Sequence, residues 1–210
     1  MYLLGLTGSV GMGKTTAADV FRCYGAAVYD ADATVHQLMR SGGRASELVR
    51  RAFPNVFRNN IIDRKALGSI VYNDKNALAE LEAILHPLVR EVQAGFLRQC
   101  AKSRKKLVVL DIPLLFEKKI DRLVDSVAVV TAPKYIQELR VLRRPEMTLE
   151  RFNQIVGHQC SDSEKRNRAD FIIQTGLGRR YSLLCIYKII KLTQNYHGLC
   201  WPPKRVNSYA

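Results

Sequence analysis

The chain has 210 residues, of which 47% are hydrophobic and 25% charged, and its formal net charge is +14. This is the composition of a globular protein, long enough for one α/β domain with insertions. No apolar run approaches the roughly 20 residues that a membrane span needs, and no basic, cleavable leader opens the chain, so we expect a cytoplasmic protein with no membrane contact.

The first predicted elements are a strand over Tyr2–Thr7, a glycine-rich turn and a helix over Lys14–Cys23. The turn reads Gly8-Ser-Val-Gly-Met-Gly-Lys-Thr15, which is the pattern of a P-loop. Its glycines let backbone N–H groups approach a phosphate, its lysine reaches the β- and γ-phosphates, and its threonine can hold Mg²⁺. A helix N-terminus favours the same anion. The order strand, loop, helix argues against a chance match. The predicted nucleotide site consists of Gly8, Gly11, Met12, Gly13, Lys14, Thr15 and Thr16, with Thr15 as the metal ligand.

Further strands are predicted over Ala26–Tyr29, Leu107–Ile112, Ser126–Thr131 and Asp170–Gln174. The middle two are nearly continuous apolar runs, as in strands buried on both faces of a parallel sheet. Helical patterns separate the strands, so the chain predicts a three-layer α/β P-loop NTPase fold with a five-stranded parallel sheet. Ligands of such sheets bind beyond the carboxyl ends of the strands.

Two intervals are too long for simple crossovers. Residues 33–106 contain apolar residues spaced by three and four between Leu78 and Phe96, which predicts an amphipathic helix, and Pro87 predicts a break or kink in it. This interval is expected to be a helical insertion that holds an acceptor. Residues 134–168 are rich in arginine and predicted to be helical, with Pro133 suited to the helix start.

The segment from Arg179 onward has six Lys+Arg and no acidic residue. Its apolar spacing predicts a helix that packs on the sheet, with its charges on a solvated face. Trp201 and the residues after it are expected to form a frayed tail.

The absence of certain motifs argues against two large classes of P-loop protein. The NKxD and DxxG elements of GTPases and the LSGGQ signature of transporter ATPases are absent, which favours a small-molecule kinase. The five cysteines and four histidines have no disulfide or zinc spacing. The charge of +14 leaves a nucleotide-dependent RNA binder as an alternative, but aromatics are only 8% and do not interleave with the cations. We therefore do not expect nucleic acid as a partner.

Several motifs together resemble the dephospho-CoA kinase family over residues 2–176. They are the P-loop, Tyr29-Asp-Ala-Asp32, Ile62-Asp-Arg-Lys-Ala-Leu67, His86-Pro87, Asp111-Ile-Pro-Leu-Leu-Phe-Glu117, Arg140-x3-Arg144 and Arg168-Ala-Asp-Phe171 with Gly176. The resemblance implies transfer of phosphate from ATP, with Mg²⁺, to the ribose 3′-hydroxyl of dephospho-CoA, the last step of coenzyme A biosynthesis. After Ala169-Asp170-Phe171-Ile172 the family usually has an acidic residue and then asparagine before the glycine, where this chain has Ile173-Gln174-Thr175-Gly176. A different small-molecule P-loop kinase stays open, as does a monomer or weak homo-oligomer.

Candidate catalytic residues are Asp32, Lys14, Arg140 and Arg144. A carboxylate just past the second strand suits activation of a hydroxyl, and the resemblance favours Asp32 over Asp30; both residues are alternatively loop or helix-cap aspartates. Arg140 and Arg144 are four apart, so both are expected on one helix face, where they could neutralise the transferring phosphate. The resemblance places that helix in a lid over ATP; the alternative is two solvated arginines.

Candidate acceptor-binding residues are Asp30, Asp32, Arg64, His86, Pro113 and Leu114. Arg64 could bind acceptor phosphates or form a weak ion pair at a helix start. His86 could contact the acceptor or be a structural histidine at a helix break. Asp111, at the end of an apolar strand, could hold a magnesium-bound water, and Glu117 is either a polar contact or a surface residue.

Overall fold

A computed structural model describes residues 1–58 and 61–202 of the chain. It divides into two compact units, one formed by Met1–Tyr29 with the chain from Cys100 onward, the other by Asp30–Gln99.

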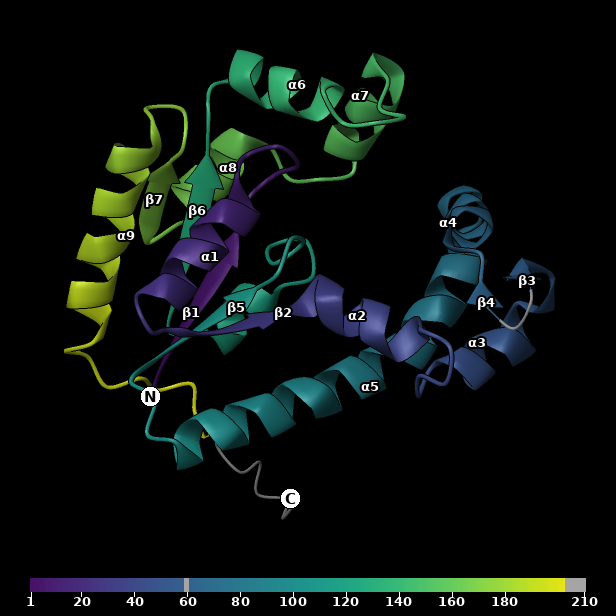
Figure 1. The fold of residues 1–210 in the computed structure, drawn as a ribbon, viewed down its shortest axis with the longest axis horizontal. Coiled ribbons are helices and arrows are strands. Elements are labelled where there is room, and N and C mark those ends of the chain that lie inside the picture. Colours follow the sequence, from purple (N-terminus) through teal and green to yellow (C-terminus); the bar gives the residue numbers. More distant parts are fainter. Residues whose placement is uncertain (59–60, 203–210) are drawn as a thin grey trace, which may run out of the picture. The chain divides into compact units, whose positions relative to one another are not determined.

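The first unit is built on a five-stranded sheet (Figure 1). The strand order is β2-β5-β1-β6-β7, and β1 pairs in parallel with β5 and β6, as β6 does with β7. The strands are β1 (Tyr2–Thr7), β2 (Ala27–Asp30), β5 (Leu107–Asp111), β6 (Ser126–Thr131) and β7 (Phe171–Gln174). All five predicted strands are therefore confirmed, within one residue at each end.

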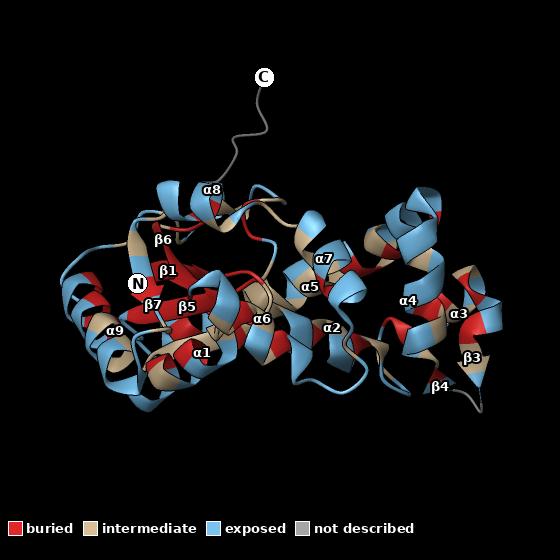
Figure 2. Ribbon diagram, turned by 90° about the horizontal axis from the view of Figure 1, so that it is seen from above, coloured by how far each residue is buried: buried red, intermediate tan, exposed pale blue. Residues whose placement is uncertain are grey.

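Helices α1 (Lys14–Cys23) and α9 (Arg179–Thr193) pack on one face of this sheet. Alternate residues of β1, such as Leu4 and Leu6, join this core, because successive side chains of a strand point to opposite faces. The α1 residue Phe21 and the α9 residue Ile186 are fully buried there. Figure 2 shows that the central strands of the sheet are the most buried part of the unit. The prediction of a C-terminal helix on the sheet is confirmed.

The opposite face is covered by residues 112–125, including a 3₁₀ turn at Ile120–Leu123, and by α8 (Asp162–Asn167). Leu115 and Phe116 are buried in this layer. The Thr131 hydroxyl at the end of β6 donates to the Asp162 carboxylate over 2.9 Å. Helices α6 (Lys134–Leu142) and α7 (Leu149–Gly157) follow β6. The three-layer α/β prediction is confirmed.

Beyond α9 the chain returns to the amino-terminal end of β1. The Asp125 carboxylate accepts from the backbone N–H groups of Leu3, Leu199 and Cys200, at 2.6 to 2.9 Å. The frayed tail was predicted from Trp201 onward, and its residues 203–210 lie outside the described part of the chain.

The second unit has its own apolar core, formed by residues such as Val49, Val56 and Leu81. Its elements are α2 (Ala31–Met39), α3 (Ser46–Ala52), a 3₁₀ turn (Pro54–Val56), β3 (Phe57–Arg58), β4 (Ile61–Ile62), α4 (Arg64–Asn73) and most of α5 (Lys75–Lys102). Of the break or kink predicted at Pro87, the break is wrong, because α5 continues through this residue. One missing N–H in a helix of 28 residues, with apolar side chains packed along it, does not end the helix.

No helix in the described residues is long and apolar enough to cross a membrane. All five cysteines are free thiols.

Candidate active site

The predicted phosphate loop connects the end of β1 to the start of α1. Gly11 and Gly13 have positive φ values of 78° and 91°, a region that side-chain-bearing residues avoid. Gly13 is the N-cap of α1 and makes no side-chain capping bond, and the first turn of α1 holds no acidic residue. The helix therefore presents backbone N–H groups without a competing carboxylate, as a phosphate site requires.

Lys14, the predicted phosphate-binding lysine, forms an ion pair with Asp111 at the end of β5. The Asp111 side chain is 4% exposed and that of Lys14 is 17% exposed, so the two opposite charges pair away from bulk water. The sequence singled out Asp111 as an acid at a strand end, and the structure brings it to the P-loop lysine. Thr15 and Thr16, in the first turn of α1, are exposed.

The backbone of the P-loop is held by side chains from distant parts of the sequence. Gln137 on α6 donates to the Val10 carbonyl over 2.8 Å, and Gln159 accepts from the Val10 N–H over 3.2 Å. The Thr175 hydroxyl donates to the Met12 carbonyl over 2.7 Å. No sequence motif marks these three residues, because an isolated glutamine or threonine has no recognisable pattern until the fold brings it to the loop.

Arg140, a predicted catalytic residue on α6, contacts the same loop. Its guanidinium donates to the hydroxyl and the carbonyl of Thr175, both at 2.9 Å, and to the Gly11 carbonyl at 3.4 Å. The structure therefore places Arg140 beside the P-loop and the stretch after β7.

The expectation that Arg144 shares a helix face with Arg140 is wrong. Helix α6 ends at Leu142, with Arg143 as its C-cap, and Arg144 lies in the turn beyond it. The cause is Pro145, since proline disfavours helical geometry in the residue before it. Arg144 is exposed.

Glu117, left open between a polar contact and a surface residue, forms a buried ion pair. Its carboxylate lies 3.0 Å from the ammonium of Lys165 on α8, a side chain with no exposed surface, and accepts the Cys160 N–H over 2.8 Å. Burial raises the pKa of Glu117, but hydrogen bonds from its own backbone N–H, the Cys160 N–H and Lys165 outweigh burial, so the pKa lies below its ordinary value. This pair fastens α8 to the connection after β5.

Pro113 and Leu114, predicted to contact the acceptor, follow β5 in that connection. The Pro113 carbonyl accepts from the Thr7 hydroxyl over 2.9 Å, which fixes it at the end of β1. The Leu114 side chain is exposed, whereas Leu115 is buried. The pair thus lies at the carboxyl edge of the sheet, with Leu114 available for contact.

Asp30 and Asp32 lie in the second unit, at the start of α2. The Asp30 carboxylate caps this helix by accepting the Ala33 N–H over 2.8 Å, so the helix-cap alternative is confirmed for Asp30. Asp32 is exposed in the first turn. Its position is set by the cap, and Asp32 is the aspartate that faces solvent.

Arg64 and His86 also lie in the second unit, and both are exposed. The Arg64 guanidinium donates to the His36 ring over 3.0 Å, while Asp63 caps α4 and pairs with Arg58 at 3.4 Å. The helix-start partner of Asp63 is therefore Arg58. His86 lies within α5, so the alternative of a histidine at a helix break is wrong.

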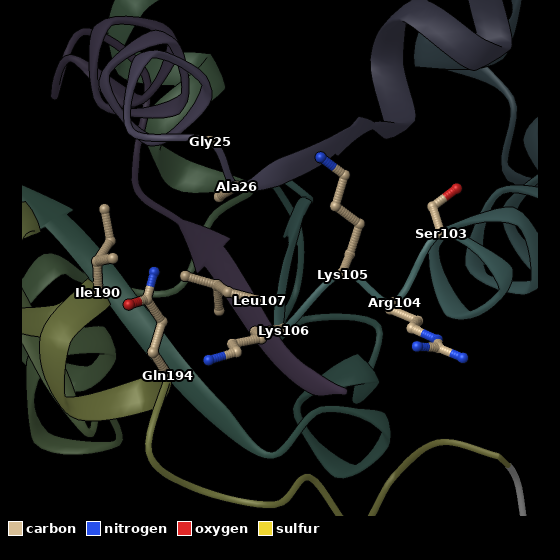
Figure 3. Close-up of a pocket in the computed structure, with 9 residues that line it drawn as sticks. All are labelled: Gly25, Ala26, Ser103, Arg104, Lys105, Lys106, Leu107, Ile190 and Gln194. Atoms are coloured by element: carbon tan, nitrogen blue, oxygen red, sulfur yellow. The ribbon is translucent and has the colours of Figure 1, made fainter.

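A cavity of about 320 Å³ lies at the opposite end of the first unit (Figure 3). It is bordered by Gly25, Gln194 and the run Ser103–Leu107, where α1, α9 and α5 end. Lys105 and Lys106 follow the C-terminus of α5, where cations offset the partial negative charge of the helix end. In Figure 3 their side chains extend in different directions. These two lysines therefore do not converge on one point of the cavity. Among the described residues, no cluster of three or more His, Cys, Asp or Glu could hold a metal.

Comparison with known proteins decides among the P-loop classes. The family model described as dephospho-CoA kinase matches residues 2–178, which include every strand of the large sheet. The chain belongs to the dephospho-CoA kinase family. This family catalyses the final step of coenzyme A biosynthesis. Helix α9 and the residues after it lie beyond the matched range.

Individual relatives agree with the family match. The dephospho-CoA kinase of Bartonella quintana is 46% identical over 91% of this chain and 97% of its own length. That of Paramagnetospirillum magneticum is 52% identical over 79% of this chain and 78% of its own. The solved structure of TT1252 from Thermus thermophilus has a TM-score of 0.83 and 30% identity, and the match covers 93% of this chain and 98% of that one.

Proposed function

We propose that this protein transfers the γ-phosphoryl group of ATP to the ribose 3′-hydroxyl of dephospho-CoA, giving ADP and coenzyme A. The new bond joins the 3′-oxygen to phosphorus, the bond to the β–γ bridging oxygen breaks, and the hydroxyl proton passes to a base. The observation that carries the proposal is a P-loop with an acid-free helix start, in a chain that the family model matches from residue 2 to 178.

The donor phosphates bind to the P-loop amides and to Lys14. A phosphate in the loop competes with Asp111 for the Lys14 ammonium, so nucleotide binding exchanges one anionic partner of this lysine for another. Mg²⁺ fits the oxygen donors at this end of the sheet, namely the Thr15 hydroxyl and the Asp111 carboxylate, because Mg²⁺ prefers oxygen ligands and retains water. When bound, Mg²⁺ supplies positive charge that stabilises the transferring phosphoryl group.

The acceptor hydroxyl is activated by Asp32, which is exposed, while Asp30 serves as the helix cap that holds Asp32 in place. Arg64 and His86, exposed in the insertion 33–106, bind the polar parts of the acceptor, and Pro113 with Leu114 contributes an apolar wall. These assignments combine the exposure of each side chain with its position in the family's motifs.

Residues 134–168 form a lid that closes over ATP. Arg140 stabilises charge in the transferring group from its place beside the P-loop, and Arg144, exposed in the turn after α6, does so when the lid closes. The contact of Arg140 with the Gly11 carbonyl supports this role, because it brings the guanidinium to the loop that binds the donor phosphates.

The experiment that tests this function measures ADP release with ATP, Mg²⁺ and dephospho-CoA, with adenosine, AMP and shikimate as parallel acceptors. We expect turnover with dephospho-CoA alone and a product phosphorylated at the 3′-position. Turnover with a different acceptor would keep the phosphotransfer and refute the substrate, and failure with all four would refute the kinase activity.

A further inference from the structure

The peptide groups on both sides of Val10 in the P-loop are fixed by two glutamine side chains. Gln137, which is 6% exposed, donates its amide N–H to the Val10 carbonyl over 2.8 Å. Gln159 offers its amide oxygen to the Val10 N–H over 3.2 Å. One glutamine therefore acts as donor and the other as acceptor.

The next two backbone carbonyls of the loop, those of Gly11 and Met12, also accept hydrogen bonds from side chains. Arg140 donates to the Gly11 carbonyl, at 3.4 Å, and Thr175 donates to the Met12 carbonyl, at 2.7 Å. A peptide group is planar, with its C=O and the following N–H pointing in opposite directions. Holding the Val10 carbonyl on one side thus directs the Gly11 N–H to the other, where the concave face of a P-loop receives its anion.

Packing brings α6 into direct contact with the loop. A Cβ atom at Gly11 would lie 2.5 Å from Val141 Cγ2 and 3.0 Å from the Gln137 carbonyl, so the loop lies directly against α6. Gln137 is on α6, and Gln159 follows α7, so both come from residues 134–168. The segment proposed as a lid is therefore hydrogen-bonded to the phosphate loop.

We propose that Gln137 and Gln159 are positioning residues that set the orientation of the P-loop amides and so determine the affinity for nucleotides with a β-phosphate. Gln137 directs the Gly11 N–H toward the phosphate, and Gln159 fixes the peptide before Val10. This proposal rests on the proposed function only in taking ATP as the donor.

The test replaces each glutamine by methionine, which has a similar length and no amide. For Gln137→Met and Gln159→Met we expect the Kd of ATP and of ADP to rise about two- to tenfold, the range expected for one lost hydrogen bond. The KM for ATP should rise by a similar factor, with kcat at saturation within about twofold. Gln154→Met, at an exposed glutamine on α7, is the matched control and should change neither.

The double variant adds a second criterion. Because both glutamines hold the same residue, the combined increase in Kd should be smaller than the product of the two single increases. Unchanged nucleotide Kd values in both single variants would overturn the proposal. If kcat falls in proportion to the fraction of folded protein while KM for ATP is unchanged, the glutamines only stabilise the fold, and the proposal is also overturned.

The donor and acceptor roles make a separate chemical prediction. Gln159→Glu keeps an oxygen that can accept the Val10 N–H, whereas Gln159→Met does not. In NMR-detected hydrogen exchange of the nucleotide-free protein, we expect Val10 to stay protected with glutamate and to exchange roughly tenfold faster or more with methionine. Equal protection in both variants would refute the contact.

Nucleotide affinity and amide exchange are measured without an acceptor. If dephospho-CoA proves to be the wrong substrate, these measurements still decide the roles of Gln137 and Gln159. Conversely, if the two glutamines prove not to position the loop, the proposal that the protein phosphorylates dephospho-CoA is unaffected.

Discussion

Lys14 is the residue whose charge the proposed reaction uses most directly. Lys14→Ala removes the ammonium that pairs with the Asp111 carboxylate and that binds the donor phosphates. We expect kcat/KM to fall about 100- to 1,000-fold, as for other losses of a preorganised charge in an active site. Steady-state assays with ATP check this, and Lys188→Ala, an exposed lysine of α9, should retain full activity. Near-normal turnover would contradict the phosphate role.

Asp32 and Asp30 can be separated because the structure gives them different tasks. Asp32→Asn removes the proposed base, so we expect kcat to fall about 100- to 10,000-fold while the Kd of ATP stays within about twofold. Asp30→Asn is the matched control, because asparagine caps a helix as well as aspartate does and preserves the start of α2. The reverse ranking of the two variants in a kinetic assay would transfer the base role to Asp30.

At the scale of elements, α8 is fastened to the connection after β5 by the pair Lys165–Glu117. Glu117→Gln leaves the fully buried Lys165 ammonium without a counter-charge, and we expect the free energy of unfolding to fall by about 3–5 kcal/mol. Lys165→Met should cost less, since the Glu117 carboxylate keeps the Cys160 N–H bond and some exposure. Urea denaturation measures both, with Glu150→Gln on the exposed side of α7 as control.

The same pair predicts a pH dependence. Because the folded protein holds the pKa of Glu117 below its ordinary 4.5, the unfolded chain takes up this proton first as pH falls. The stabilisation is complete above pH 4.5 and is lost as pH drops through the lower folded value. The free energy of unfolding of the wild-type protein should therefore decline more steeply below pH 4.5 than that of Glu117→Gln. Parallel pH profiles would contradict the assignment.

At the scale of the whole molecule, the core between α1, α9 and the large sheet holds β1 and α1, the two elements that the P-loop connects. Phe21, with no exposed surface, joins these three parts of the chain. Phe21→Ala should lower the free energy of unfolding by about 3–5 kcal/mol, because it leaves a cavity that the packed strands cannot fill. Urea denaturation checks the value, and Cys23→Ala, at an exposed position of α1, should change it little. A loss below 1 kcal/mol would show that this core repacks.

Local patterns in the sequence predicted most of the scaffold. The P-loop and the apolar strand runs Tyr2–Thr7 and Ser126–Thr131 carry their own signals, because glycine spacing and uninterrupted apolar runs reflect local backbone needs. Element ends were harder to predict. Pro145 ends α6 before Arg144, whereas Pro87 leaves α5 unbroken, and only the surrounding packing distinguishes the two prolines.

The phosphate loop, the order of strands and helices along the chain, and the set of charged residues available for catalysis can be predicted from the sequence, since these depend on short-range spacing. Which side chains meet depends on the packing of the folded chain. Lys14 and Asp111 are 97 positions apart, and Val10 and Gln159 are 149 apart. No local pattern encodes such pairs, because they form only when parallel strands align their carboxyl ends and the stretch after α7 packs on the loop.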